Sequence, residues 1–286
     1  MKKIKNPKIA LIQMAMSSDK KKNIDKALSF IAKAKQKGAD IVCLPELFTT
    51  LYFCQSEDKS SFNLAEEIPG PATEIMANAA KEHEITLIAG SIFEKGKDRK
   101  FYNTSTAFSK EGKMIGRYSK VHIPYDPGFY ERTFFTGGKE YSTYDTEFGK
   151  FSTLICWDQW FPEAARINTL RGAKLIFYPT AIGWIESMRK MEPFSQKRWE
   201  QVHCSHASVN GIFVAAVNRV GNEGKTEFWG NSLVADPFGN VIARASSDKE
   251  EILFAELDLS LIESSQKGWG FLKGRRPDTY SDLVKR

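Results

Sequence analysis

The sequence predicts an α/β protein, a four-layer α-β-β-α sandwich built from two similar halves that each follow the order β-α-β-α-β-β. Short apolar runs typical of strands alternate with longer stretches that have helical spacing, and the same order then recurs along the 286 residues. Strands that alternate with helices indicate sheets covered by helices, and two such halves pack most simply sheet on sheet. We therefore expect one domain over residues 1–286.

The first half is predicted to begin with a buried strand and to end in a hairpin. Its first helix has apolar residues at helical spacing and Gly38 just past its end. Pro45 closes the second strand, and Pro71 begins the second helix. The predicted elements are a strand at 8–14, a helix at 22–37, a strand at 40–44, a helix at 71–84, a strand at 85–93 and a hairpin of 103–109 with 113–119.

The second half repeats this order. Its hairpin turns at Pro237-Phe238-Gly239, a composition that favours a turn between two strands. The predicted elements are a strand at 151–156, a helix at 162–171, a strand at 173–178, a helix at 194–210, a strand at 212–218 and a hairpin of 231–235 with 240–245.

Local sequence similarity supports the repeat. Three pairs of segments match in the same order, and the offset between partners falls steadily, as expected when only loops change length. In chain order, the pairs are Leu11-Ile12-Gln13 with Leu154-Ile155-Cys156, 38–45 with 172–179, and 112–117 with 239–244. Residues 256–286 fall outside both halves and are expected to form a polar and aromatic tail that covers an edge or reaches a partner subunit.

Composition excludes several classes of protein. The net charge is +6, but the basic residues are scattered, whereas a nucleic-acid binder gathers them on one stripe. No apolar run approaches the ~20 residues of a membrane span, and no apolar signal region follows the charged N-terminus. We expect a soluble cytoplasmic protein that binds neither nucleic acid nor membrane.

Cysteine and histidine spacing gives no metal site and no disulfide framework. The cysteines are Cys43, Cys54, Cys156 and Cys204, with no Cys-x-x-Cys pair. His203 and His206 lie three apart on a predicted helix, but no third cluster of ligands is visible. Packing on a helix face is the favoured interpretation, and we expect no metal and no cofactor.

Three residues whose side chains could take part in catalysis stand at strand ends, where α/β folds bind their ligands. Glu46 follows strand 40–44, Lys120 follows strand 113–119, and Cys156 ends strand 151–156. A cysteine near a helix start suits a nucleophile, because helix N–H groups stabilise a thiolate and an oxyanion. A carboxylate can take the thiol proton, and an ammonium can hold the oxyanion. Taken alone, each residue also fits an ordinary buried or surface position.

Three segments around these residues resemble the catalytic signatures of the nitrilase superfamily, in the order Glu, Lys, Cys. The segments are Leu44-Pro45-Glu46-Leu47-Phe48, residues 118–124 and Leu154-Ile155-Cys156-Trp157-Asp158. The resemblance implies the four-layer fold, with Cys156 as nucleophile, Glu46 as base and Lys120 at the oxyanion. Glu131 resembles the second family glutamate, which holds the lysine and helps to orient substrate. Gly137-Gly138 departs from the Pro-Gly that the family usually has there.

Within the superfamily, the chain is most similar to N-carbamoylputrescine amidohydrolases. The matching segments are 156–166, 177–183, 52–55 and 275–277. This resemblance implies hydrolysis of N-carbamoylputrescine to putrescine, carbon dioxide and ammonia through a carbamoyl-enzyme on Cys156, the last step from agmatine to putrescine. It also implies a homo-oligomer, a dimer or higher.

The residues just beyond Cys156 favour a cationic or neutral substrate tail. Asp158 and Gln159 stand where relatives that act on N-carbamoyl acids carry arginines that grip a carboxylate. The candidate substrate-binding residues are Trp157, Asp158, Tyr130, Asp126, Trp184 and Glu186. The alternatives are a β-ureidopropionase, an ω-amidase, with less support a true nitrilase, and, from another class, a non-catalytic binding or assembly module.

Overall fold

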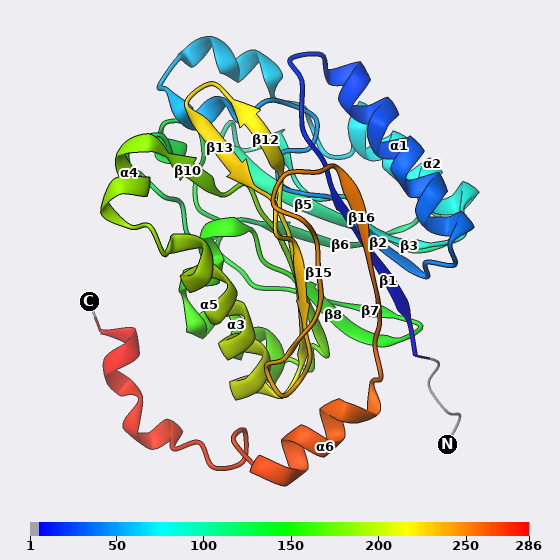
Figure 1. Cartoon of the computed structure of the whole chain (residues 1–286), viewed down its shortest axis with the longest axis vertical. Coiled ribbons are helices and arrows are strands. Elements are labelled where there is room, and N and C mark those ends of the chain that lie inside the picture. Colours follow the sequence, from blue (N-terminus) through cyan, green and yellow to red (C-terminus); the bar gives the residue numbers. More distant parts are fainter. Residues whose placement is uncertain (1–5, 286) are drawn as a thin grey trace.

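The computed structural model describes residues 6–285, so residues 1–5 and Arg286, the last residue of the predicted tail, lie outside the described part. Two sheets lie between two layers of helices (Figure 1). Helices α1 (Lys20–Gln36) and α2 (Pro71–Glu82) cover the first sheet, and α3 (Pro162–Leu170) and α5 (Ser195–Asn210) cover the second. The predicted four-layer α-β-β-α sandwich is confirmed.

The first sheet has the strand order β16-β1-β2-β3-β5-β4, with β6 also paired to β5. Strands β1, β2 and β3 run parallel, and β5 is antiparallel to β3 and to β6. The strands are β1 (Lys8–Gln13), β2 (Ile41–Cys43), β3 (Thr86–Ile88), β4 (Ile92–Lys95), β5 (Phe101–Phe108), β6 (Met114–Ser119) and β16 (Glu251–Glu256).

The second sheet, of order β15-β14-β11-β9-β8-β7, repeats this pairing. Strands β8, β9 and β11 run parallel, and β14 is antiparallel to β11 and to β15. Both hairpins even contain a register shift, between Ala107 and Phe108 and between Val234 and Ala235. The strands are β7 (Thr143–Thr146), β8 (Gly149–Thr153), β9 (Leu175–Pro179), β11 (Phe213–Val217), β14 (Leu233–Ala235) and β15 (Val241–Arg244).

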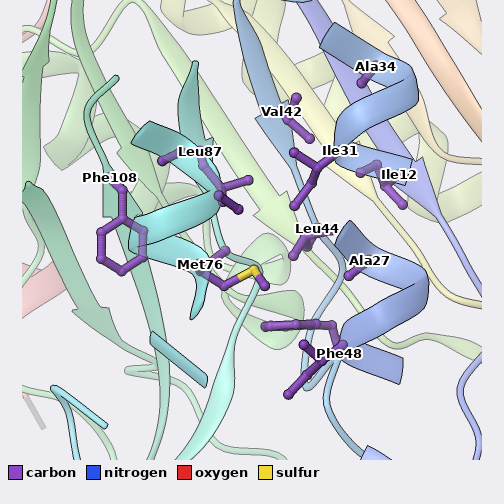
Figure 2. Close-up of a cluster of buried hydrophobic side chains, with 14 of the residues drawn as sticks. Ile12, Ala27, Ile31, Ala34, Val42, Leu44, Phe48, Met76, Leu87 and Phe108 are labelled. Carbon is purple, nitrogen blue, oxygen red and sulfur yellow. The ribbon is translucent and has the colours of Figure 1, made fainter. Parts of the chain in front are cut away.

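Alternation along the strands sorts their side chains into separate apolar cores. In β1, Ala10 and Ile12 face the helices, while Ile9 and Leu11 face the other sheet. Figure 2 shows the helix-facing core, where Ile31 of α1 and Met76 of α2 point toward the sheet. In β9, alternate residues likewise join the core between the sheets and the core beneath α3 and α5. The strands are therefore apolar on both faces, as the sequence indicated.

Two predicted strands end differently in the structure. The strand predicted at 85–93 divides into β3 and β4 at Gly90, which has a φ of 51°. A β-carbon at Gly90 would lie 2.0 Å from the carbonyl oxygen of Pro45, so glycine lets this turn approach the segment that carries Glu46. The strand predicted at 151–156 ends at Thr153, and Cys156 instead begins the 3₁₀ helix η4 (Cys156–Trp160).

The structure contains elements that the sequence did not predict. A three-stranded sheet is formed by β10 (Gly183–Ile185), β13 (Thr226–Trp229) and β12 (Val220–Glu223), and helix α4 (Glu186–Met191) follows β10. Strand β16 pairs along the whole of β1, and α6 (Ser260–Trp269) follows it. The first residues of the predicted tail are thus part of the sandwich, since Leu257 and Ile262 join the core between the sheets. No described helix is long and apolar enough to span a membrane.

Candidate active site

The structure brings Glu46, Lys120 and Glu131 together in a buried cluster. The Lys120 ammonium donates to Glu46 Oε1 at 2.9 Å and to Glu131 Oε1 and Oε2 at 2.9 and 2.6 Å. All three side chains are fully buried. Asn103 Nδ2 donates to Glu46 Oε1 at 2.7 Å, and Tyr52 Oη donates to Glu131 Oε1 at 2.7 Å. These bonds fix both carboxylates around one cation.

Burial and mutual charge perturb the pKa values in this cluster. Burial opposes the charged form of Lys120, but the carboxylates of Glu131 and Glu46 outweigh it and raise the pKa of Lys120 well above its usual range. Burial raises the pKa of Glu131 to about 7, with the Glu46 charge adding to this rise and the Lys120 charge opposing it. The cluster therefore keeps its ammonium and contains a carboxyl group that titrates near neutrality.

Cys156 lies at the bottom of a cavity of about 440 Å³ that Glu131 also lines. Its backbone φ is 42°, and its side chain is almost fully buried. Burial raises the pKa of the Cys156 thiol well above its usual range, and the charge of Glu46 raises it further while that of Lys120 opposes this. A protonated thiol needs a base before it can attack. Glu46 Oε2 is buried without a hydrogen-bond partner among the described residues, which leaves it free to accept that proton.

The turn at Cys156 is held by Asp158. Its Oδ2 accepts from the Ile155 N–H at 3.0 Å and from Tyr118 Oη at 2.7 Å. Its Oδ1 accepts from the His122 N–H at 3.0 Å and lies 2.8 Å from His122 Nδ1. Asp158 is fully buried and does not line the cavity. The prediction that Asp158 binds a substrate amine is therefore wrong, because both of its oxygens are already used to hold η4.

Arg219, from the second half, holds the turn that carries Glu46. Its fully buried guanidinium donates to the carbonyl of Glu46 at 3.1 Å and to that of Leu47 at 2.6 Å, and it pairs with Glu223 at 2.8 Å. Glu223 Oε2 also accepts from the Tyr52 N–H at 2.6 Å. Sequence reasoning missed this network. The available signal was a charged residue just after the strand predicted at 212–218, followed by the apolar Val220.

The cavity walls are mainly aromatic and apolar. They include Phe129, Trp157, Trp160, Trp184, Met188 and Trp229. Three of the predicted substrate-binding residues, Trp157, Asp126 and Trp184, line this cavity. Aromatic faces of this kind suit an alkyl chain or a cationic group.

Tyr130 and Glu186 do not line the cavity. Tyr130 packs on Tyr125, with ring centroids 5.6 Å apart. The Glu186 side chain is exposed and pairs with Lys190 one helical turn away, at 2.9 Å. These two predicted contacts are corrected for the same reason: each residue is close in sequence to the cavity, but its local element turns the side chain away.

Glu192 and Arg198 line the cavity and were not predicted. Arg198 Nη1 lies 3.1 Å from Glu192 Oε2. The residues that directly follow Cys156 carry no arginine, as the sequence shows, but α5 supplies one from a distant segment.

Among the described residues there is no group of three or more His, Cys, Asp or Glu side chains that could hold a metal ion. His203 and His206 lie on the buried face of α5. Burial lowers the pKa of His203 to about 3 and that of His206 to about 4. His203 Nδ1 lies 2.8 Å from the Trp199 carbonyl, and His206 Nδ1 lies 3.0 Å from Tyr178 Oη. Both residues therefore pack on the helix face.

Comparison with known proteins agrees with this geometry. Residues 8–267 match the family model for carbon–nitrogen hydrolases. An N-carbamoylputrescine amidase of Solanum lycopersicum is 38% identical, over 96% of this chain and 94% of the relative. A citrullinase of Francisella tularensis is 34% identical, over 98% and 99%. A crystal structure of a carbon–nitrogen hydrolase from Helicobacter pylori G27 has a TM-score of 0.94 and 38% identity, and the match covers 99% of each chain.

Proposed function

The chain belongs to the carbon–nitrogen hydrolases of the nitrilase superfamily, and on this premise we propose that it hydrolyses N-carbamoylputrescine to putrescine, carbon dioxide and ammonia. One observation carries the proposal. A single cavity joins the buried Cys156 to two carboxylates nearer the solvent, Asp126 and Glu192. This arrangement fits a molecule with an uncharged ureido group at one end and an ammonium at the other.

In the proposed first step, Glu46 takes the proton of the Cys156 thiol, and the thiolate attacks the ureido carbonyl carbon. The Lys120 ammonium and the backbone N–H of Trp157, in the first turn of η4, stabilise the oxyanion. The bond to the terminal nitrogen then breaks, and ammonia leaves with the proton that Glu46 had taken. A thioester that carries the putrescine chain remains on Cys156.

In the second step, Glu46 activates a water molecule that attacks the thioester carbonyl. The bond from carbon to sulfur breaks, and the thiol regains its proton. The product is the carbamate of putrescine, which loses carbon dioxide to give putrescine. Glu131 holds Lys120 throughout, and no metal or organic cofactor takes part in this scheme.

Citrulline is the second candidate substrate, because Arg198 lines the cavity and one relative is named a citrullinase. Citrulline has a ureido group on a short chain that ends in both an ammonium and a carboxylate, so an arginine is the residue expected to bind its carboxylate. β-Ureidopropionase and ω-amidase activities are tested by the same assays.

Ammonia release from a panel of ureides and amides tests the proposal. N-carbamoylputrescine should be hydrolysed with a higher kcat/KM than citrulline, N-carbamoyl-β-alanine or ω-amides. Cys156→Ala should abolish turnover, and iodoacetamide should label Cys156 faster than Cys43 or Cys204. Turnover by Cys156→Ala would exclude the cysteine mechanism. No turnover by the wild-type protein, with slow labelling of Cys156, would favour a binding module instead. The homo-oligomer and the cytoplasmic location stay predictions from the sequence.

A further inference from the structure

The cavity has a mainly aromatic and apolar wall, a deep end with Cys156 and Glu131, and a charged outer part. Cys156 and Glu131 lie deep and are almost fully buried, whereas Asp126, Glu192 and Arg198 are exposed. These three charged residues come from three different segments: the loop before η3 (Glu131–Thr133), the end of α4 and the first turn of α5. The reacting group therefore meets the deep end, and the far end of the substrate meets the outer charges.

The outer guanidinium is already paired through one of its nitrogens. Arg198 Nη1 lies 3.1 Å from Glu192 Oε2, and Ser195 Oγ donates to the same oxygen at 3.1 Å. No described residue hydrogen-bonds to Glu192 Oε1. Glu192 thus competes with a substrate carboxylate for Arg198, while its own Oε1 stays available for a substrate ammonium.

The charges of this outer part also favour a cation. Two carboxylates, Asp126 and Glu192, and one guanidinium, Arg198, give a formal charge of −1. A substrate that ends in a lone ammonium is attracted, whereas an α-amino acid must also place a carboxylate beside Asp126 and Glu192.

Building on the proposed function, we infer that Glu192 determines specificity by binding the substrate ammonium and by masking Arg198 from substrate carboxylates. The pair separates ω-ureido amines from ω-ureido α-amino acids, two classes that differ only in one carboxylate. Glu192 acts on the choice of substrate and takes no part in the attack by Cys156.

Glu192→Gln tests this inference through the ratio of kcat/KM for N-carbamoylputrescine to kcat/KM for citrulline. It should lower kcat/KM for N-carbamoylputrescine about fivefold, the size expected for one exposed charge pair, and raise it for citrulline. In the Glu192→Gln background, the second change Arg198→Gln should remove the gain for citrulline, because Arg198 is the group that Glu192 masks. The matched control is Glu227→Gln, which breaks an exposed ion pair with Arg189 of similar exposure outside the cavity lining.

Two further measurements separate a specific effect from a general one. Butylurea has the ureido group without a charged end, so wild type and Glu192→Gln should hydrolyse it at the same rate. If Glu192→Gln lost as much activity on butylurea as on N-carbamoylputrescine, the cause would be a displaced α4, and the inference would be overturned. Titration calorimetry measures the Kd of N-carbamoylputrescine and of citrulline with Cys156→Ala, which does not turn them over. The ratio of the two Kd values, with and without Glu192→Gln, tests the same preference by binding alone.

The outcomes are distinguishable. If Glu192→Gln changes the ratio no more than Glu227→Gln does, the inference is wrong and the proposed function stands. If the wild type prefers citrulline, both are wrong. If the wild type hydrolyses neither compound, the proposed function fails, and the calorimetric ratio decides the role of Glu192 alone.

Discussion

A single ammonium shared by two buried carboxylates dominates the chemistry of individual residues in the cavity. Lys120 lies within 3 Å of both Glu46 and Glu131, and none of the three side chains reaches solvent. One cation neutralises one carboxylate, so the second carries an uncompensated charge and its protonation is favoured. Burial and the Glu46 charge raise the pKa of Glu131 to about 7, so its charge changes near neutrality, close to the base of the reaction.

Glu131→Gln should consequently move the acid limb of the activity profile to lower pH. In the wild type, kcat/KM should fall below about pH 7, the raised pKa of Glu131, because a protonated Glu131 loses the charge that holds the Lys120 ammonium. Glutamine has no carboxyl group to protonate, so the fall near pH 7 should disappear from the profile, while kcat drops because Lys120 is held less firmly. Rates from about pH 5 to pH 9 measure this. A limb that stays in place or moves up would contradict its assignment to Glu131.

The residues of the site were predictable to different degrees. Glu46, Lys120, Glu131 and Cys156 each lie in a local segment that singles them out. The structure joins the first three in one buried cluster, and Glu131 and Cys156 line the same cavity. The prediction that Asp158 binds substrate was wrong because the direction of its side chain depends on the turn of η4. The strand predicted through residue 156 would not make this turn. Glu192 and Arg198 could not be predicted, because only the folding of residues 186–198 brings them to a cavity whose nucleophile is far away in sequence.

Among the elements, the turn after β2 depends on a residue just before β12. Arg219 satisfies the carbonyls of Glu46 and Leu47, which no strand or helix uses, and Leu47 has a positive φ of 48°. Glu223 compensates the buried guanidinium. The second half thereby fixes the position of the base that the first half supplies, which makes Arg219 a positioning residue.

Arg219→Lys should lower kcat about tenfold with a smaller effect on KM. A lysine keeps the charge, but its three N–H donors lie on one nitrogen, whereas Arg219 makes five hydrogen bonds through a planar fork, so part of the network is lost. The misplaced base should slow attack, and the partly unpaired Glu223 should cost about 2 kcal/mol of unfolding free energy. Steady-state kinetics and thermal unfolding measure the two effects. Arg244→Lys, whose ion pair with Glu200 lies outside the cavity lining, is the control. A lower Tm with unchanged kcat would make the role of Arg219 purely structural.

Element prediction succeeded where the repeat applied and failed outside it. The helices and the parallel strands have strong apolar periodicity and recur in both halves. Strands β12 and β13 are four residues each, joined at Gly224-Lys225, and carry too little pattern to be found. Strand β16 was missed because its partner is β1, at the other end of the chain, and pairing over that distance leaves no local signal.

At the scale of the whole molecule, the end of α6 and the chain beyond it expose apolar side chains to solvent. Trp269 and Phe271 stack with ring centroids 5.6 Å apart, yet they are 68% and 46% exposed, and Val284 is 86% exposed. Figure 1 shows this segment running along the outside of the sandwich, beyond α3 and α5. Arg166 Nη1 is buried without a partner among the described residues, and Arg275 lies near enough to lower the pKa of Arg166 in addition to the effect of burial. Apolar groups this exposed, in a segment whose Arg275 lies near the buried Arg166, fit a surface that a second copy covers.

Removal of residues 270–286 should therefore lower the mass of the assembly while each chain stays folded. Phe271, Leu283 and Val284 lie outside the apolar cores of the sandwich, so their loss takes nothing from those cores but removes the apolar area available for association. Light scattering after size exclusion should give a smaller species than the full chain at equal concentration, with unchanged circular dichroism. The cavity contains no residue of this segment, so a loss of mass with retained turnover would separate assembly from catalysis. An unchanged mass would place the subunit interface elsewhere, and Arg166→Gln would then be expected to leave association unaltered as well.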